Sequence, residues 1–325
     1  MKYFFSIILF FMFTTFSNAQ IVDCEIHYVD FNQQTEGLDT LLVQMDKADI
    51  STACIMGLPL QKIWDEHNEI KPKTFESDNA KLYYYSMTDV ILAEALLKLP
   101  TEQRKRFKPL ISGFNPVDKN AIDHIQRMVA LYPDFWAGIG EILTRHDILS
   151  GMTYGVNARA DHPALMKVYQ YATEMNLPVV LHSNITSTRE KKLIYLDEIT
   201  NTLKNNKNTT FIWAHAGMSA NIERRQHIKH LDGIIEESLK KYPNLNILLS
   251  WTLTSNYLFD KKGKVNQKWI DLVIKYSDRF LIGSDVVGKF GNLGKALKDE
   301  KSFLTYLPED IAKKIAYENA LRLFP

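Results

Sequence analysis

Eight short apolar runs, separated by segments with helical periodicity, restrict the fold of this chain more than any other feature. The runs span residues 22–28, 52–56, 108–112, 136–142, 178–182, 210–215, 246–250 and 279–283. Most are continuously apolar, which is typical of parallel strands covered on both faces. Helical patterns between them include residues 38–48, 121–131, 163–175, 221–241 and 269–275. Eight strand–helix units predict an α/β fold, a closed (β/α)8 TIM barrel.

The length of the chain agrees with one catalytic domain that follows a leader segment. The sequence has 325 residues, 46% of them hydrophobic, and a barrel of this type needs roughly 250. Residues 1–19 read as a signal peptide, with Lys2, an apolar stretch and a small-residue cleavage site at Ser17–Ala19. We therefore expect a single domain over residues 20–325 in an exported protein, periplasmic or secreted. No stretch is long and apolar enough for stable membrane insertion.

Charge and cysteine content restrict the partners and the covalent structure. Lys and Arg number 39 against 38 Asp and Glu, without a basic stripe, so nucleic acid is not an expected partner. A small-molecule substrate is expected, and the sequence also permits a homo-oligomer. Cys24 and Cys54 allow one disulfide in an exported chain. Because both lie within predicted strands, two buried free thiols are the favoured interpretation.

Five of the predicted strands end on residues of the types that bind metal ions. They are Glu25 and His27 on the first strand, Glu141 on the fourth, His182 on the fifth, His215 on the sixth and Asp285 on the eighth. Because a barrel presents the carboxyl ends of its strands at one face, these side chains are expected to converge. Carboxylate and imidazole groups bind zinc and manganese. The sequence thus predicts a site for one or two divalent ions, with zinc expected and manganese the alternative.

Taken singly, these residues also have structural explanations. Glu25 and His27 lie one residue apart, on one face of a strand, where they could form an ion pair. The two later histidines could be structural, and Asp285 could cap the helix that follows it. Glu141 could be neutralised by Arg145. The convergence of all six residues favours a metal site.

Two connections are longer than a barrel requires. Residues 57–86 and 252–267 are polar and rich in aromatic side chains, including Trp64 and Tyr257. Long loops at the carboxyl ends of barrel strands are usually functional. We expect them to form the walls or lid of a substrate pocket, with surface decoration as the alternative.

The strand-end residues resemble those of the amidohydrolase superfamily, in particular the amidohydrolase-related metal-dependent hydrolases (amidohydrolase family 2), over nearly the whole mature chain. In that superfamily a His-x-His pair ends strand one, a lysine or glutamate strand four, histidines strands five and six, and an aspartate strand eight. Glu25 stands where the superfamily has its first histidine. A carboxylate remains a competent ligand, so the resemblance still implies a metal centre.

The resemblance also implies roles for these residues. A single ion would be held by Glu25, His27, His182 and Asp285. With two ions, Glu141 would bridge them, and His182 and His215 would bind the second. Asp285 is the expected general base, and His215 would orient water or substrate. Arg145 is expected to contact an anionic substrate group, with a salt bridge to a neighbouring acid as the alternative.

Three functions fit these residues. The first is a hydrolase that uses a metal-activated water on an amide, lactone or ester bond. The second is a metal-dependent non-oxidative decarboxylase of an aromatic or unsaturated acid, because a Glu-x-His pair on strand one resembles the decarboxylases of the same group. The third is a barrel that binds a ligand without catalysis. A carboxylate on strand four, Glu141, favours a bridged site and hydrolysis.

Overall fold

The computed structural model describes residues 20–59, 86–146, 157–251 and 253–324, and within them nine parallel strands form one curled sheet. The sheet order is β8-β7-β6-β5-β4-β3-β2-β1-β9, so each of the first eight strands lies beside its neighbour in the chain. The strands are β1 Ile21–His27, β2 Ile50–Met56, β3 Phe107–Ile111, β4 Gly138–Thr144, β5 Val179–Ser183, β6 Phe211–Ala214, β7 Leu245–Leu249, β8 Phe280–Ile282 and β9 Val286–Val287. The predicted (β/α)8 barrel is confirmed, with β9 as a short addition.

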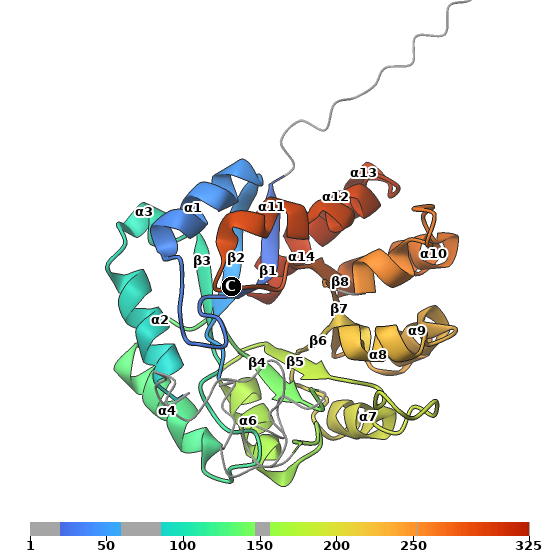
Figure 1. Ribbon diagram of the computed structural model, residues 1–325. Helices are drawn as coiled ribbons and strands as arrows, with labels where there is room; N and C mark the ends of the chain where they lie inside the picture. Colours follow the sequence, from blue (N-terminus) through green and yellow to red (C-terminus); the bar gives the residue numbers. More distant parts are fainter. Residues whose placement is uncertain (1–19, 60–85, 147–156, 252, 325) are drawn as a thin grey trace, which may run out of the picture.

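Helices surround the strands as an outer ring (Figure 1). They are α1 Leu38–Lys47, α2 Met87–Leu97, α3 Thr101–Arg104, α4 Ala121–Leu131, α6 Pro163–Glu174, α7 Leu196–Asn205, α8 Ala220–Arg225, α9 Leu231–Lys241, α10 Gln267–Lys275, α11 Leu293–Ala296, α12 Lys298–Leu304, α13 Glu309–Lys313 and α14 Asn319–Leu323. Shorter turns are the 3₁₀ segments η1 His215–Gly217, η3 Ser277–Arg279 and η4 Phe290–Asn292, and the π segments η2 Thr254–Leu258 and η5 Lys314–Glu318. No helix among the described residues is long and apolar enough to cross a membrane.

The single helix expected over residues 221–241 is wrong. The chain forms α8 and α9 there, separated by residues 226–230. Gln226 adopts an extended backbone, and its side-chain amide donates to the carbonyls of Ser187 and Glu190. The backbone N–H of Ile228 donates to the hydroxyl of Tyr257, at 2.9 Å. These tertiary hydrogen bonds, which periodicity cannot reveal, stabilise the interruption.

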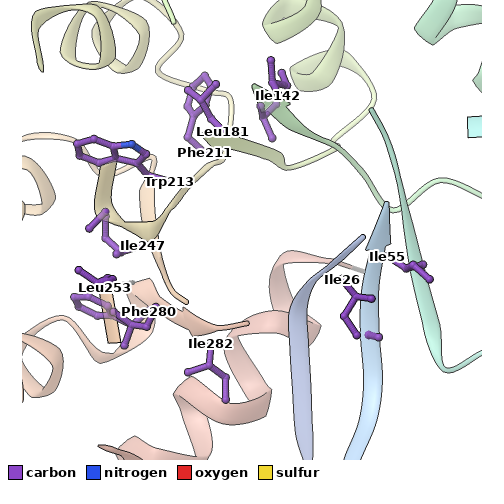
Figure 2. Packing of buried hydrophobic residues seen from close by; sticks show 14 of the residues in the cluster. Ile26, Ile55, Ile142, Leu181, Phe211, Trp213, Ile247, Leu253, Phe280 and Ile282 are labelled. Atoms are coloured by element: carbon purple, nitrogen blue, oxygen red, sulfur yellow. The ribbon is translucent and has the colours of Figure 1, made fainter. Parts of the chain in front are cut away.

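Two apolar clusters lie on the two faces of the sheet. The barrel interior holds Val22, Cys24, Cys54, Met56, Leu110, Val180, Ile212, Leu248 and Leu281, and α14 closes its amino-terminal end. Outward-facing side chains pack between strands and helices (Figure 2), among them Ile26, Ile55, Ile142, Leu181, Phe211, Trp213, Ile247, Phe280 and Ile282. Burial of each such side chain contributes about 1.5–3 kcal/mol. The predicted buried free thiols are confirmed, since Cys24 and Cys54 are unpaired in the interior cluster.

A bulge in β1 changes which of its side chains face inward. Asp23 pairs with Ala53 and Ile26 with Ile55, so β1 has one more residue than β2 over this stretch. Cys24 and Glu25 therefore both face the interior, although they are consecutive. Ile26 then packs outward and the next residue, His27, returns inward. The predicted common face of Glu25 and His27 is confirmed, but Asp23 does not share it.

Some predictions fall on residues outside the described ranges. The signal peptide over residues 1–19 is one of them, and most of the expected wall over residues 57–86, with Trp64 and the tyrosines at 83–85, is another. The second expected wall is described from residue 253 onward. There Tyr257 stacks on His227, with ring centroids 4.6 Å apart, and Phe259 contacts the ring of Phe303.

Candidate metal centre

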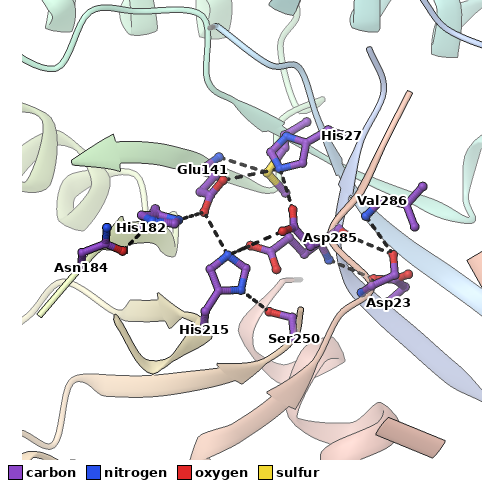
Figure 3. A network of polar contacts seen from close by, with 12 residues as sticks. Asp23, His27, Glu141, His182, Asn184, His215, Ser250, Asp285 and Val286 are labelled. Carbon is purple, nitrogen blue, oxygen red and sulfur yellow. Dashed lines mark hydrogen bonds and ion pairs between the residues drawn. The ribbon is translucent and has the colours of Figure 1, made fainter. Parts of the chain in front are cut away.

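All six predicted ligands converge at one end of the barrel, and Figure 3 labels His27, Glu141, His182, His215 and Asp285 around the centre. His27 Nε2 lies 3.4 Å from Glu141 Oε2 and 3.3 Å from Asp285 Oδ1. His215 Nε2 lies 3.7 Å from Glu141 Oε1 and 3.8 Å from both Glu25 Oε1 and Asp285 Oδ2. The six residues come from β1, β4, β5 and the segments after β6 and β8. One small volume thus holds three carboxylates and the inner nitrogens of these imidazoles.

The backbone is unusual where two of these side chains leave their strands. His215 directly follows β6 and Asp285 lies just beyond β8, and both have φ 53°. Left-handed backbone is uncommon for residues other than glycine, and such strain gathers at functional sites. The tertiary structure therefore stabilises conformations that turn both side chains toward the centre.

Each of the three histidines has an acceptor at its outer nitrogen. His27 Nδ1 lies 3.1 Å from the carbonyl oxygen of Gly57. His182 Nε2 lies 3.1 Å from Asn184 Oδ1, and His215 Nδ1 lies 2.8 Å from Ser250 Oγ. When the outer N–H of a neutral ring donates to such an acceptor, the inner nitrogen carries a lone pair. Hydrogen bonds of this kind orient metal-binding histidines.

The inner nitrogens all face carboxylates. His27 and His215 direct Nε2 toward the centre, and His182 places Nδ1 3.0 Å from Glu141 Oε1. A lone pair facing a carboxylate is repulsive unless a proton or a metal ion lies between them. Burial lowers the pKa of His215 and so favours its neutral, metal-binding form.

Glu25 is the most isolated acid of the group. Its side chain is fully buried, and neither carboxylate oxygen has a hydrogen-bond partner of normal geometry within the described part of the chain, although the nearby Ser250 hydroxyl partly lowers its pKa. Burial, reinforced by the charges of Asp285 and Glu141, raises the pKa of Glu25 well above its usual range. A buried carboxylate without such partners is costly unless a cation compensates its charge. This carboxylate therefore fits a metal ligand better than an internal ion pair.

The pKa shifts of His27 and Glu141 indicate that the centre favours bound positive charge. Burial opposes protonation of His27, but the carboxylates of Asp285 and Glu141 raise the pKa of its imidazole well above the ordinary value. Burial would also raise the pKa of Glu141, but His182 and His27 lower it well below the usual range. In metal-free protein, protons would balance part of the carboxylate charge, and a divalent cation would replace them.

Donor atoms of the site fall into two overlapping groups of three, each with all its atoms within 4.8 Å of one another. One is Glu141, His182 and His215, and the other is Glu25, His215 and Asp285. His27 lies beside both through its contacts to Glu141 and Asp285. The donor set, with imidazole nitrogens and carboxylate oxygens, fits zinc or manganese.

Arg145, the predicted substrate contact, has a protein partner. Its Nε donates to Glu198 Oε2 at 2.9 Å, its Nη2 donates to Glu198 Oε1 at 2.6 Å, and the guanidinium lies 4.3 Å from the ring centroid of Tyr195. Glu198 lies in the first turn of α7 and is buried. The alternative salt bridge is therefore present, and a contact of Arg145 with substrate stays a prediction.

Four residues near the centre were not expected from the sequence. Asn184 and Ser250 orient His182 and His215, as described above. Trp251 follows Ser250 with φ 50° and places its ring 5.2 Å from that of His215, with 37% of the residue exposed. The fourth is Asp23, which the bulge directs away from the centre. The positions of Asn184 and Ser250 at or next to predicted strand ends were a signal in the sequence, but their hydrogen bonds to the histidines were not.

A separate cavity of about 1000 Å³ lies between the connections that follow β6 and β7. Its lining includes Arg225, Lys229, Tyr257 and Lys264, and none of the six predicted ligands contributes to it. Among the described residues, the predicted metal ligands therefore lie at the strand ends and not in this cavity.

A model of the Amidohydrolase family (Amidohydro_2) matches residues 101–325, which is more than half of the chain. The matched segment includes the ligands on strands four, five, six and eight. No curated protein matches the sequence.

Solved structures share the fold at low identity. A zinc-bound amidohydrolase of Burkholderia multivorans is 11% identical, with a TM-score of 0.59 over 94% of this chain and 99% of that one. A Pseudomonas putida protein named as a 2-pyrone-4,6-dicarboxylic acid hydrolase is 13% identical, with a TM-score of 0.54 over 94% and 97%. A 2,6-dihydroxybenzoate decarboxylase bound to 2,6-dihydroxybenzoate is 16% identical, with a TM-score of 0.56 over 94% and 99%. At such identities the likeness shows the fold alone.

Proposed function

Because the chain belongs to the amidohydrolase family, as its strand-end residues predicted, we propose that it is a metal-dependent hydrolase of an amide, lactone or ester bond. The observation that carries this proposal is the arrangement of its three histidines. Each has an acceptor at the outer nitrogen and directs the inner nitrogen at a carboxylate. That pattern supports a divalent cation at the centre, with zinc as the expected ion and manganese as the alternative.

Two positions for the cation follow from the two donor groups, and both include His215. Glu141 lies against all three imidazoles and would bridge two ions, whereas a single ion could be held beside Glu25 and Asp285. When bound, the ion would polarise the scissile carbonyl and lower the pKa of the attacking water.

Asp285 is the residue we assign to proton transfer. Its side chain is 14% exposed, more than either other carboxylate of the centre, so it can reach both the buried ligands and an entering substrate. Its Oδ1 lies near His27 and its Oδ2 near His215. In hydrolysis it would take the proton of the attacking water and return it to the leaving group.

The second candidate is decarboxylation of an aromatic or unsaturated acid, and Glu25 favours it. This carboxylate replaces the usual first histidine, adds negative charge and weakens a bound cation as a Lewis acid. The structural likeness to 2,6-dihydroxybenzoate decarboxylase is compatible with this reading. In this reaction Asp285 would instead donate a proton to the carbon that loses carbon dioxide. Decarboxylation does not need the strand-four carboxylate Glu141, so its presence favours hydrolysis.

A metal-reconstituted activity screen tests these candidates. Protein purified without added metal is analysed for bound metals, loaded separately with zinc and manganese, and assayed on lactones, esters, amides and aromatic carboxylic acids. Hydrolysis and release of carbon dioxide are followed separately. Hydrolysis of one class supports the first proposal, and carbon dioxide release without hydrolysis supports the second. Protein that binds neither metal would refute both and would leave a ligand-binding barrel.

We also propose export, on the sequence of residues 1–19 alone. Expression of the full chain followed by fractionation and N-terminal sequencing tests this proposal. A mature protein that begins near Gln20 outside the cytoplasm is the expected result, and an intact Met1 on the cytoplasmic protein would refute it.

A further inference from the structure

The barrel has a seam where its last strand meets its first. Among the described residues, β8 pairs with β7 and β9 pairs with β1, but no strand ladder joins β8 to β1. The two carboxylates beside this seam, Glu25 and Asp285, come from opposite ends of the sequence. Whatever closes the seam therefore determines their separation.

The short β1–β9 ladder begins directly after Asp285, and a few hydrogen bonds span the seam just before it. The N–H of Asp285 donates to the carbonyl of Glu25 at 2.9 Å, and Ser284 Oγ lies 3.3 Å from the same carbonyl. Gly283 permits this approach, because a Cβ there would lie 2.9 Å from the Cβ of Glu25.

The side chain of Asp23 also connects the two sides of the seam. Its Oδ1 accepts the N–H of Ser284 at 2.9 Å and the N–H of Glu25 at 3.1 Å, so one oxygen holds both sides of the seam. The residue is fully buried, and its Oδ2 has no hydrogen-bond partner in the described part of the chain. A buried carboxylate is a costly way to accept two hydrogen bonds. Its burial beside the candidate metal centre indicates that its two hydrogen bonds maintain the relative position of the strand ends.

We infer that Asp23 is a positioning residue, which holds the strand ends of Glu25 and Asp285 together so that their carboxylates meet at His215. The inference rests on the proposed metal centre, because it concerns two of the ligands assigned there. Loss of the Asp23 carboxylate would leave two buried N–H groups without an acceptor and let the seam open. The donor group of Glu25, His215 and Asp285 would then bind metal more weakly.

The test compares three variants of the full chain. Asp23→Ala removes the acceptor, and Asp23→Asn retains a carbonyl oxygen and nearly the same volume. Asn246→Ala is the matched control, because Asn246 is equally buried and donates across strands to the carbonyl of Phe211, away from the seam. Manganese binding is measured by calorimetry, and amide hydrogen exchange at residues 284–287 is measured in the metal-free protein.

We expect Asp23→Ala to weaken manganese binding by about 10- to 100-fold, the range for residues that orient metal ligands. Exchange at Ser284 and Asp285 should accelerate by about tenfold or more, since the seam opens locally. Asp23→Asn should stay close to wild type in both measurements, and Asn246→Ala should alter neither. Equal losses in Asp23→Ala and Asn246→Ala would overturn the inference, as would wild-type affinity and exchange in Asp23→Ala.

Two further outcomes remain decisive. If Asp23→Ala does not fold, slow exchange of the Glu25 and Ser284 amides in wild type and in Asp23→Asn supports the inference, and fast exchange of either amide in wild type overturns it. If wild type binds no metal, the proposed function fails, whereas exchange in the metal-free protein still decides the role of Asp23.

Discussion

Replacement of Glu25 by methionine should stabilise the metal-free protein and at the same time abolish its response to metal. The Glu25 carboxylate is fully buried, and neither of its oxygens has a hydrogen-bond partner of normal geometry among the described residues. Methionine has a similar length and removes both oxygens. The same change should therefore affect folding and metal binding in opposite directions.

The expected size follows from the cost of buried polar groups without partners. Such groups cost about 1–3 kcal/mol, so Glu25→Met should raise the free energy of unfolding of metal-free protein by about 2 kcal/mol. For a chain of this size that gain corresponds to a rise in Tm of about 3 °C. Wild type should instead gain about 2.7 kcal/mol from manganese at 100 times its Kd. The stability order of the two proteins should thus reverse when metal is added.

Thermal and urea unfolding with and without manganese measure both effects. Glu198→Met is the matched control, because Glu198 is also a buried glutamate but accepts two hydrogen bonds from Arg145. Loss of that pair should lower stability by about 3 kcal/mol and leave the response to metal intact.

Two results would refute this reasoning. Metal-free Glu25→Met that is less stable than wild type would show that the carboxylate has a stabilising partner in the fold. A variant that gains as much stability from manganese as wild type would show that Glu25 is not a ligand.

Three other predictions concern the remaining side chains. Asp285→Asn should reduce kcat by about 10²- to 10⁴-fold and retain most of the bound metal, since the amide can coordinate but cannot accept a proton; near-normal turnover would remove it from the base role. Trp251→Ala should raise KM by about two- to tenfold for a substrate identified in the screen, with metal content unchanged, and an unaltered KM would mean that the indole makes no contact with it. Burial raises the pKa of Asp23 from 3.8 to about 6, so folding of the metal-free protein takes up a proton between these values. Asp23 should therefore lower the stability by about 3 kcal/mol as the pH rises from about 4 to above 6, and the fall measured by urea unfolding of Asp23→Asn should be smaller by this amount.

Strand positions were well predicted because continuous apolar runs report burial on both faces of a parallel sheet. The first eight strands lie within two residues of their predicted bounds, and α4 coincides with the helix expected at 121–131. The break between α8 and α9 was not predicted, because it depends on hydrogen bonds from Gln226 and Ile228 to distant residues. Periodicity records local burial and carries no information on such contacts.

The roles of individual polar residues likewise divide into those that the sequence predicts and those that depend on tertiary contacts. All six candidate ligands could be located from sequence, since a barrel gathers its strand ends and the residue types at those ends are visible. The pairing of Arg145 with Glu198 could not be chosen over a substrate contact, because it depends on where α7 packs. Likewise, the acceptors on Gly57, Asn184 and Ser250 become visible only when the connections are placed beside the histidines.

By itself, the sequence determined a (β/α)8 barrel of the amidohydrolase family with a set of candidate metal ligands at its strand ends. The barrel follows from the repeated alternation of apolar runs and helical segments. The candidate ligands follow from the residue types at the ends of those runs, so both are visible in the sequence. Tertiary structure alone decided the orientation of each imidazole and the burial of the Glu25 carboxylate beside Asp285 and Glu141. It also decided the role of Asp23, since a bulge in β1 and a seam without a ladder bring residues 23 and 284 together. Contacts between residues so far apart depend on closure of the barrel, and no local pattern encodes them.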